Sequence, residues 1–298
     1  MANPSPQGPM LHVPVLSTEV LSSLHIYPNG VYFDGTIGTG GHAALIIQQL
    51  SSQGLYIGID RDEEALSHCR QRFSASPVSI SLHHRSYHKI KSTLDLHGVQ
   101  QVNGFLLDLG LSSMQLESNS RGFSFQSDSP LDMRFDQSQS KAAGDILNTM
   151  PAQDLANIIY KNGEERRSRA IAKNIEKCRP LKSVFDLVDA VRRVTHPKHR
   201  NRTLARVFQA IRINVNSELE YLNIFLANFI DYLTIGGRIA IISFHSLEDR
   251  QVKHKFKKLS DEGRLAILTP KPITASGTEI ANNRRSKSAK LRVAERMA

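Results

Sequence analysis

Residues 33–42 read FDGTIGTGGH, and this stretch decides the fold because it joins a short apolar run to a helical pattern through a glycine-rich loop. An acid, Asp34, stands at the end of the run Val31–Phe33, and glycines follow at positions 35, 38, 40 and 41. Glycine is used where the backbone takes a positive φ or where another group comes close to it. The stretch therefore predicts a ligand-binding turn at the carboxyl end of a first strand, with an ordinary strand-to-helix turn as the alternative.

Strand-like runs alternate with helical patterns on both sides of this loop, which indicates a parallel sheet. The predicted strands are 31–34, 55–60, 78–83, 102–107 and 238–244, with an antiparallel edge formed by RLAILT (264–269) and KLRVAE (290–295). Between them, residues 116–205 contain no convincing strand and read as three helices, with Thr149 and Ser183 as N-caps. We therefore predict a doubly wound α/β sheet in two parts, 1–115 and 206–298, interrupted by a helical domain at 116–205.

The positive charge is concentrated in one part of the chain. The 298 residues carry a formal net charge of +10, and residues 161–212 hold 15 of the 38 Lys and Arg but only 5 of the 28 Asp and Glu. The rest of the chain is therefore balanced, and the excess lies in the helical segment. Such a patch is typical of proteins that bind a polyanion, most often a nucleic acid, and the alternative is a solvated helix face.

Several classes of protein are disfavoured by composition. Cys69 and Cys178 are the only cysteines and form no CxxC pattern, which argues against a disulfide scaffold or a zinc site and fits a reducing cytoplasm. The first ten residues, MANPSPQGPM, have no basic residue and no apolar core, so we expect a loose tail and no signal peptide. Apolar runs stay well below the roughly 20 residues of a membrane span, so we expect no membrane partner.

The spacing around the glycine loop favours a particular cofactor. The order of the glycines does not fit the dinucleotide pattern G-x-G-x-x-G, but Asp34, Gly38 and Gly40 fit an acid-x-x-x-Gly-x-Gly loop that wraps a methionine moiety. Asp60 ends the second strand, 22 residues after Gly38, where an acid accepts hydrogen bonds from ribose hydroxyls. The alternative role for Asp60 is the N-cap of the following helix. An acid in this place fits NAD and S-adenosylmethionine (SAM) alike, and the order of the glycines favours SAM.

Three further residues are candidates for the same crevice. Tyr87 follows the third strand and is placed to stack on an adenine, although a single aromatic residue is more often part of the core. Asp108 ends the fourth strand, and His245 follows the late strand that we expect beside it. An acid and a histidine at one cavity can orient a base and receive a proton, whereas the alternatives are a structural histidine and a helix-start ion pair around Glu248.

The chain resembles the RsmH (MraW) family over nearly its whole length. The shared motifs, in chain order, are HVPVL (12–16), DGTIGTGGH (34–42), IDRD (59–62), LLDLGLSSMQL (106–116), RGFSF (121–125), PLDMRFD (130–136), RTLARVFQAIRINVNSELE (202–220), ISFHSLEDR (242–250) and KLRVAER (290–296). The resemblance implies a class I SAM-dependent methyltransferase fold with an inserted helical domain. It also implies methylation of the exocyclic N4 of a cytidine in the decoding centre, at the P site, of bacterial 16S ribosomal RNA.

Carried over residue by residue, the resemblance implies a set of SAM contacts. They are Gly40, Gly41, His42, Asp60, Tyr87, Asp108 and Gln115. Two positions depart from the family pattern: Tyr87 stands where the family has Phe, and Met114 stands where it has Pro. The segment Asp108–Leu111 is also not the Asp/Asn-Pro-Pro-aromatic motif of many amino-group methyltransferases, which leaves the activation of the amine open.

The expected reaction is a direct displacement, for which the protein supplies proximity and orientation. Asp108 and His245 are the predicted catalytic residues, and basic residues of the insertion are predicted to hold the RNA backbone: Arg166, Arg167, Arg169, Arg192 and Arg193. The expected partner is 16S ribosomal RNA in an assembling or assembled small subunit, with no metal. A nicotinamide oxidoreductase and a non-catalytic ribosome-assembly factor are the alternatives, and SAM binding with NADH as the control separates them.

Overall fold

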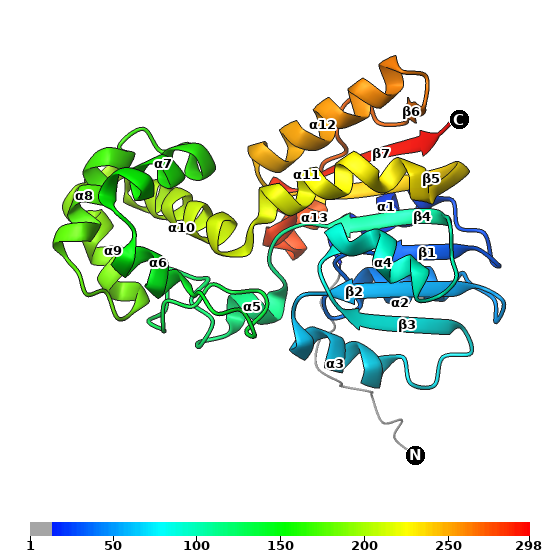
Figure 1. The fold of residues 1–298 in the computed structure, drawn as a ribbon, viewed down its shortest axis with the longest axis horizontal. Helices are drawn as coiled ribbons and strands as arrows, with labels where there is room; N and C mark the ends of the chain where they lie inside the picture. The colour runs from blue at the N-terminus through cyan, green and yellow to red at the C-terminus, as the bar shows by residue number, and fades with distance from the viewer. Residues whose placement is uncertain (1–13) are drawn as a thin grey trace. The chain divides into compact units, whose positions relative to one another are not determined.

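The computed structural model describes residues 14–298, which divide into two units (Figure 1). The sheet unit comprises the chain up to Gly110 together with Tyr221–Ala298, and the helical unit comprises Leu111–Glu220. The expected loose tail at residues 1–10 lies outside the described residues. Within the described part of the chain, no helix is both long enough and apolar enough to cross a bilayer.

The sheet unit contains seven strands in the order β3-β2-β1-β4-β5-β7-β6. Their bounds are β1 Val31–Asp34, β2 Leu55–Asp60, β3 Ser79–His84, β4 Val102–Asp108, β5 Leu233–Ser243, β6 Leu265–Ile267 and β7 Lys290–Arg296. Strands β1 to β5 pair in parallel, whereas β7 pairs antiparallel with β5 and β6. The predicted doubly wound sheet, the pairing of the late strand with β4 and the antiparallel edge are confirmed.

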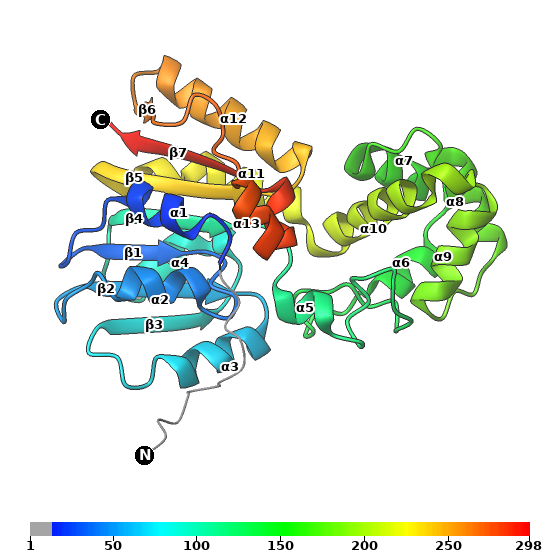
Figure 2. The same cartoon turned by 180° about the vertical axis from the view of Figure 1, so that it is seen from behind.

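Helices cover both faces of this sheet, as the two opposite views show (Figures 1 and 2). The helices of this part are α1 Ser17–Leu24, α2 Gly41–Ile47, α3 Glu63–Arg72, α4 Ile90–Asp95, α11 Glu218–Asn228, α12 Ser246–Asp261 and α13 Gly277–Asn282. Successive strand residues point to opposite faces, so Phe105 packs with α11 and α12 while the next residue, Leu106, packs with α1 and α2. The continuous apolar runs Phe105–Leu107 of β4 and Ile239–Ile242 of β5 follow from this burial on both faces.

The helical unit has its own apolar core. Its helices are α5 Ser113–Glu117, α6 Ala143–Thr149, α7 Ala152–Gly163, α8 Ser168–Lys177, α9 Val184–Arg193 and α10 Arg200–Asn216. Ser183 caps α9 through a reciprocal capping box with Asp186, as predicted. The predicted cap at Thr149 is wrong: this residue ends α6, where its hydroxyl donates to the Asp145 carbonyl at 2.7 Å, and α7 begins after Pro151.

The bounds of the helical unit differ from those expected from the sequence. The expected boundary after residue 205 falls inside α10, whose buried residues Leu204, Val207 and Ile211 all belong to the helical core. The apolar repeat of α10 therefore continues through the expected boundary, and the unit ends only at Glu220. At the other end it begins at Leu111, directly after the loop that follows β4.

Candidate active site

The carboxyl ends of the parallel strands place a row of polar side chains along one edge of the sheet. Asp34 ends β1, Asp60 ends β2, Asp108 ends β4 and Ser243 ends β5. The register aligns them, since Asp108 pairs with Ile242 of β5. In open α/β sheets this edge is where ligands bind.

The glycine loop folds back onto the end of β2. Gly38, at a φ of 52°, donates its backbone N–H to the Asp60 carboxylate at 2.8 Å. Gly40 has a φ of 81°, and a Cβ there would stand 2.8 Å from the Phe73 ring, so both conformation and packing require glycine. At Gly38, by contrast, the nearest atom to an added Cβ would be 3.9 Å away. The loop backbone therefore packs closely against Phe73 at Gly40, whereas at Gly38 there is space beside the backbone.

Asp34 is directed into the protein and supports this loop. Its two carboxylate oxygens accept hydrogen bonds from the Tyr56 hydroxyl at 2.6 Å and from the Thr36 backbone at 3.0 Å, and the residue is only 2% exposed. Burial raises the pKa of Asp34 to about 7, and these two hydrogen bonds act in the opposite direction. The geometry makes Asp34 a support for the turn.

Thr36 connects the loop to the next strand, a contact that the sequence reasoning missed. Its hydroxyl oxygen accepts the backbone N–H of Asp108 at 2.6 Å. The ends of β1 and β4 are thereby held together at the point where a ligand would meet both. The sequence did contain a hint of this contact: Thr36 stands two positions after Asp34, and short polar side chains in such turns often form hydrogen bonds with nearby backbone groups.

The Asp60 carboxylate joins the glycine loop to the start of α3. Its two oxygens accept the N–H groups of Gly38 at 2.8 Å and Asp62 at 2.9 Å. The Arg61 backbone hydrogen-bonds the same carboxylate, which leaves one of its roughly four lone-pair sites to accept from a ribose hydroxyl. Burial raises the pKa of Asp60, while the backbone hydrogen bonds lower it. The alternative role as a helix N-cap is wrong, because the side chain that caps α3 is that of Asp62, accepting from Glu64 at 3.2 Å.

His42 and Asp108 bring two unsatisfied polar atoms to one place. The His42 Nε2 lies 3.8 Å from the Asp108 Oδ2, and His42 is 7% exposed. The His42 Nε2 and the Asp108 Oδ1 are buried without a hydrogen-bond partner among residues 14–298. Buried polar atoms are rarely left unpaired, so the pair marks a position for a polar ligand group. Desolvation lowers the pKa of His42 to about 4, which makes the ring neutral at physiological pH.

Asp108 has a carboxyl group whose ionisation is finely balanced. Burial raises its pKa to about 7, the charge of Arg285 lowers it, and the charges of Asp34 and Glu248 raise it. Arg285 lies in the short helical turn Arg284–Ser288, which follows α13. The polar composition of this segment gave no sequence signal for a role at the site. Arg285 is thus a site residue that only the structure reveals.

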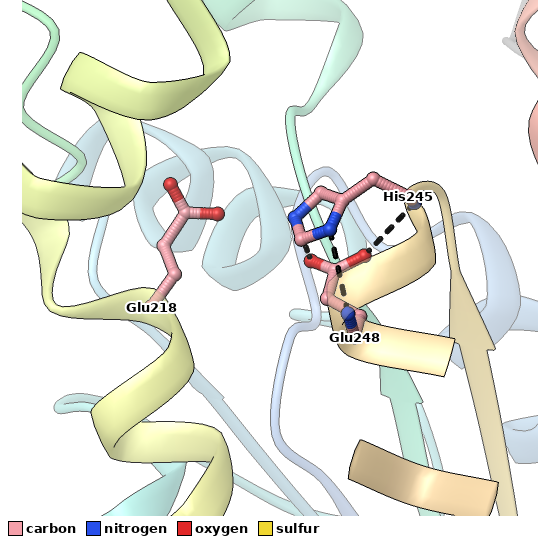
Figure 3. Close-up of side chains that lie close together, drawn as sticks. All are labelled: Glu218, His245 and Glu248. Carbon is pink, nitrogen blue, oxygen red and sulfur yellow. Dashed lines mark hydrogen bonds and ion pairs between the residues drawn. The ribbon is translucent and has the colours of Figure 1, made fainter. Parts of the chain in front are cut away.

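His245 is the N-cap of α12 and forms a capping box with Glu248 (Figure 3). Its Nδ1 accepts the Glu248 backbone N–H at 3.4 Å, and its Nε2 lies 3.2 Å from the Glu248 Oε1. The Glu248 carboxylate also accepts the N–H of Phe244 at 2.9 Å. Because Nδ1 accepts, the neutral ring carries its proton on Nε2. The helix-start role that the sequence left open for Glu248 is therefore present.

Tyr87 and Gln115, two other predicted SAM contacts, lie in different units. The Tyr87 ring is 9% exposed and meets the Phe225 ring edge-on, with 5.7 Å between the ring centroids. Gln115 belongs to the helical unit, where its side chain accepts the Ser112 backbone N–H at 3.1 Å in the capping box of α5. Gln115 is 5% exposed. Their contacts with SAM stay predictions.

The five predicted RNA-binding arginines all lie on the surface of the helical unit. Arg166, Arg167 and Arg169 surround the start of α8, and Arg192 and Arg193 end α9; all five are exposed. Arg193 also donates to the Cys178 sulfur at 3.7 Å, at the other end of α8. Their contact with RNA is likewise a prediction.

The sheet order, the two helical layers and the row of acids at one edge define a class I, Rossmann-like methyltransferase fold. The sequence profile of the MraW methylase family matches residues 9–297, and the chain belongs to this family. A relative from Kosmotoga olearia, "Ribosomal RNA small subunit methyltransferase H", is 45% identical and aligns over 96% of this chain and 97% of its own. The protein of that name from Geobacter sp. (strain M21) is 43% identical over 96% and 98%.

Among solved structures, an rRNA methylase from Streptococcus thermophilus aligns with 97% of this chain and 99% of its own. Its TM-score is 0.44 at 12% identity, a likeness too weak to bear on the activity.

Proposed function

We propose that this protein transfers the methyl group of SAM to the exocyclic N4 of a cytidine in the decoding centre of 16S ribosomal RNA. Membership of the MraW methylase family and the names of relatives 43–45% identical over nearly the whole chain support a small-subunit rRNA methyltransferase. The choice of N4 and of the P-site cytidine rests on the motifs shared with the family. A cytoplasmic location follows as part of the same proposal.

The observation that carries the proposal is the facing pair of unsatisfied atoms, the His42 Nε2 and the Asp108 Oδ1, beside the glycine loop. The methionine part of SAM carries an ammonium, and its N–H groups can donate to the neutral His42 Nε2 and to the Asp108 carboxylate. Asp60 ends β2, which is separated from β4 by β1 in the sheet, and its carboxylate can still accept a hydrogen bond from the ribose hydroxyls. The residues at the edge therefore fit SAM.

Bound SAM supplies a methyl group that is already electrophilic on its sulfonium. The nitrogen of the cytosine amine is a weak nucleophile because its lone pair is delocalised into the ring. The Asp108 carboxylate accepts one of the amine N–H groups and so directs the lone pair toward the methyl group. It also fixes the amine at reacting distance, which is the largest contribution that positioning residues make. The proton leaves after transfer, to Asp108 or to water.

His245 has a smaller part in this scheme. Its Nδ1 already accepts a backbone hydrogen bond, and its Nε2 faces Glu248. With Nδ1 accepting this bond and the proton on Nε2, the neutral ring has no lone pair left for a substrate proton, although Nε2 is buried without a hydrogen-bond partner among residues 14–298. We assign His245 to the positioning of the β5–α12 turn, and Asp108 to direct contact with the amine.

The arginines of the helical unit supply the RNA contacts in this proposal, because phosphate contacts are made largely by exposed Arg and Lys. The target base is unstacked to reach the SAM edge, at a cost of a few kcal/mol. The substrate is proposed to be the RNA within an assembling or assembled small subunit.

The test is methyl transfer from isotope-labelled SAM to small subunits and to naked 16S RNA, both lacking the modification. After digestion to nucleosides, the label is expected in N4-methylcytidine from a decoding-centre fragment. Calorimetry with SAM, and with NADH as the control, is run on the same preparation. SAM binding with label in another nucleoside would refute the assigned atom, and NADH binding without SAM binding would refute the methyltransferase.

A further inference from the structure

The helix α8 carries a gradually winding line of positive charge on its solvent side. Arg169, Lys173 and Lys177 stand at spacings of four residues, and all three are exposed. At about 100° per residue they fall within about 80° of one another around the helix axis. Exposed Arg166 continues the line before the helix. At the C-terminal end of α8, Arg193 continues it through its hydrogen bond to the Cys178 sulfur.

The opposite side of α8 is fully committed to the core. Its buried residues are Ser168, Ile171, Ala172 and Ile175, and the last three belong to the helical core. The helix therefore cannot turn about its axis, and the basic line is held outward. The exposed residues beside the line are Ala170, whose small side chain leaves the helix surface open, and Glu176, which lies on the same side of the helix as Arg169 and Lys173.

Acidic groups near this line are already engaged. Glu176, the only acid within Ser168–Lys177, accepts the Ala152 N–H at 3.1 Å and lies 3.8 Å from the Arg179 guanidinium. Within residues 14–298, none of the side chains of Arg166, Arg169, Lys173 and Lys177 forms an ion pair in the structure. The line is thus free to meet phosphates.

The start of α8 is anchored by a buried glutamate. Glu165, 5% exposed, accepts the Arg167 N–H at 3.0 Å, the Thr203 hydroxyl at 3.3 Å and the Arg206 guanidinium at 3.4 Å. Thr203 and Arg206 belong to α10, so the turn that begins the line is fixed to a second helix. Because the backbone that carries the line is fixed, binding has to order only the exposed side chains.

We infer that α8 is a phosphate track for a single strand of RNA, with Arg166, Arg169, Lys173 and Lys177 contacting successive phosphates. This inference rests on the proposed function. Four residues of helix rise about 6 Å, which is commensurate with the step between neighbouring phosphates of one extended strand. Contacts of this kind hold the backbone and leave the bases free for another part of the protein.

The test compares two double variants that remove the same charge. Lys173→Gln with Lys177→Gln removes two of the four positive charges of the track, whereas Lys141→Gln with Lys253→Gln removes two exposed charges that do not belong to α8. Binding to a single-stranded 16S RNA fragment is measured across a salt series. The track variant is expected to lower the log–log slope by about 0.7 for each lost contact and the affinity about tenfold at 0.15 M salt. The control is expected to change both much less.

Three further measurements separate the possible outcomes. Lys173→Arg with Lys177→Arg keeps the charge and is expected to keep the slope, and thermal unfolding and SAM calorimetry on every variant exclude a folding defect. Equal losses in track and control variants, or an unchanged slope in the track variant while methylation continues, would overturn the track but leave the methyltransferase intact. Absence of SAM binding and of methyl transfer in the unmodified protein would instead overturn the proposed function.

Discussion

Asp34 and Asp60 end two neighbouring strands, yet their surroundings give them different tasks. Both oxygens of Asp34 are used by Tyr56 and Thr36, and the residue is almost fully buried. Asp60 is half-buried and faces the loop at Gly38. The sequence pattern marked both acids as SAM contacts because it reports position along a strand, whereas the partner of each oxygen depends on residues from other strands.

The first prediction concerns Asp60. Asp60→Ala is expected to weaken SAM binding at least tenfold, because hydrogen bonds to a charged group contribute roughly 1.5–3 kcal/mol each. Isothermal calorimetry measures the affinity. Asp62→Ala is the matched control, since it removes a neighbouring carboxylate that caps α3 and leaves Asp60 in place. Equal SAM affinities in the folded Asp60 variant and the unmodified protein would exclude the ribose role.

The second prediction concerns the proton on Asp108. Its pKa is raised to about 7, so the carboxyl group is protonated below that pH and can no longer accept an N–H from the amine. We expect kcat/KM for methylation to rise with pH through about 7.

Asp108→Asn is expected to remove most of the activity, and a variant with full turnover at saturating substrates would rule out a catalytic Asp108.

Arg285 provides an independent check on this assignment. Its charge lowers the pKa of Asp108, so Arg285→Gln is expected to raise that pKa and to move the acid limb of the profile to higher pH. The exposed neighbour Arg284 offers the control substitution Arg284→Gln. A limb that stays in place in the Arg285 variant would assign the titration to another group, such as Asp34.

At the scale of the element, two substitutions at the start of α12 distinguish the helix-capping role of His245 from a catalytic role. Asn caps helices well and lacks an imidazole, whereas Ala supplies neither a cap nor a base. His245→Asn is therefore expected to keep the stability and most of the methylation, and His245→Ala is expected to lose about 0.5–2 kcal/mol of stability. Thermal unfolding and turnover are measured together. Loss of turnover in a stable Asn variant would return His245 to the list of catalytic residues.

The elements differ in how well the sequence predicts them. The bounds of β1 and β2 are as predicted, because each strand is a buried run closed by an acid and a turn. The segment 270–289 gave no such pattern, but it contains α13 and the turn that carries Arg285. Glu279 of α13 accepts the Leu16 N–H at 2.8 Å, a contact across 263 residues. Structure that depends on such distant partners leaves little local signal.

At the scale of the molecule, the sequence placed the insertion correctly in the chain order but not its second boundary. The repeat in α10 buries residues in the helical core, and the repeat in α11 buries residues in the sheet core. Composition cannot assign either repeat to a core. The core to which each helix belongs depends on the residues that it packs against, and these contacts place the division between the units at Glu220.

The last prediction concerns the division of tasks between the two units. Charge reversal at Arg166, Arg167 and Arg169 together is expected to weaken RNA binding and to flatten its salt dependence, while SAM affinity and thermal stability change little because all three are exposed. Filter binding across a salt series and SAM calorimetry measure the two effects. An unchanged slope with normal methylation would direct attention to another basic segment, NNRRSKSAK (282–290), which holds four Lys and Arg and no acid.

The neighbouring strands β4 and β5 are separated by the whole helical unit, and this has a consequence during synthesis on the ribosome. Asp108 ends β4, whereas β5 begins only at Leu233. At elongation rates of about 5–20 residues per second, the intervening chain takes roughly 6–25 seconds to emerge. During that interval the nascent sheet presents β4 as an open edge, with unpaired backbone groups that invite aggregation. A helical unit that folds by itself in this interval draws the two strands' attachment points together and shortens the effective loop that β5 must close.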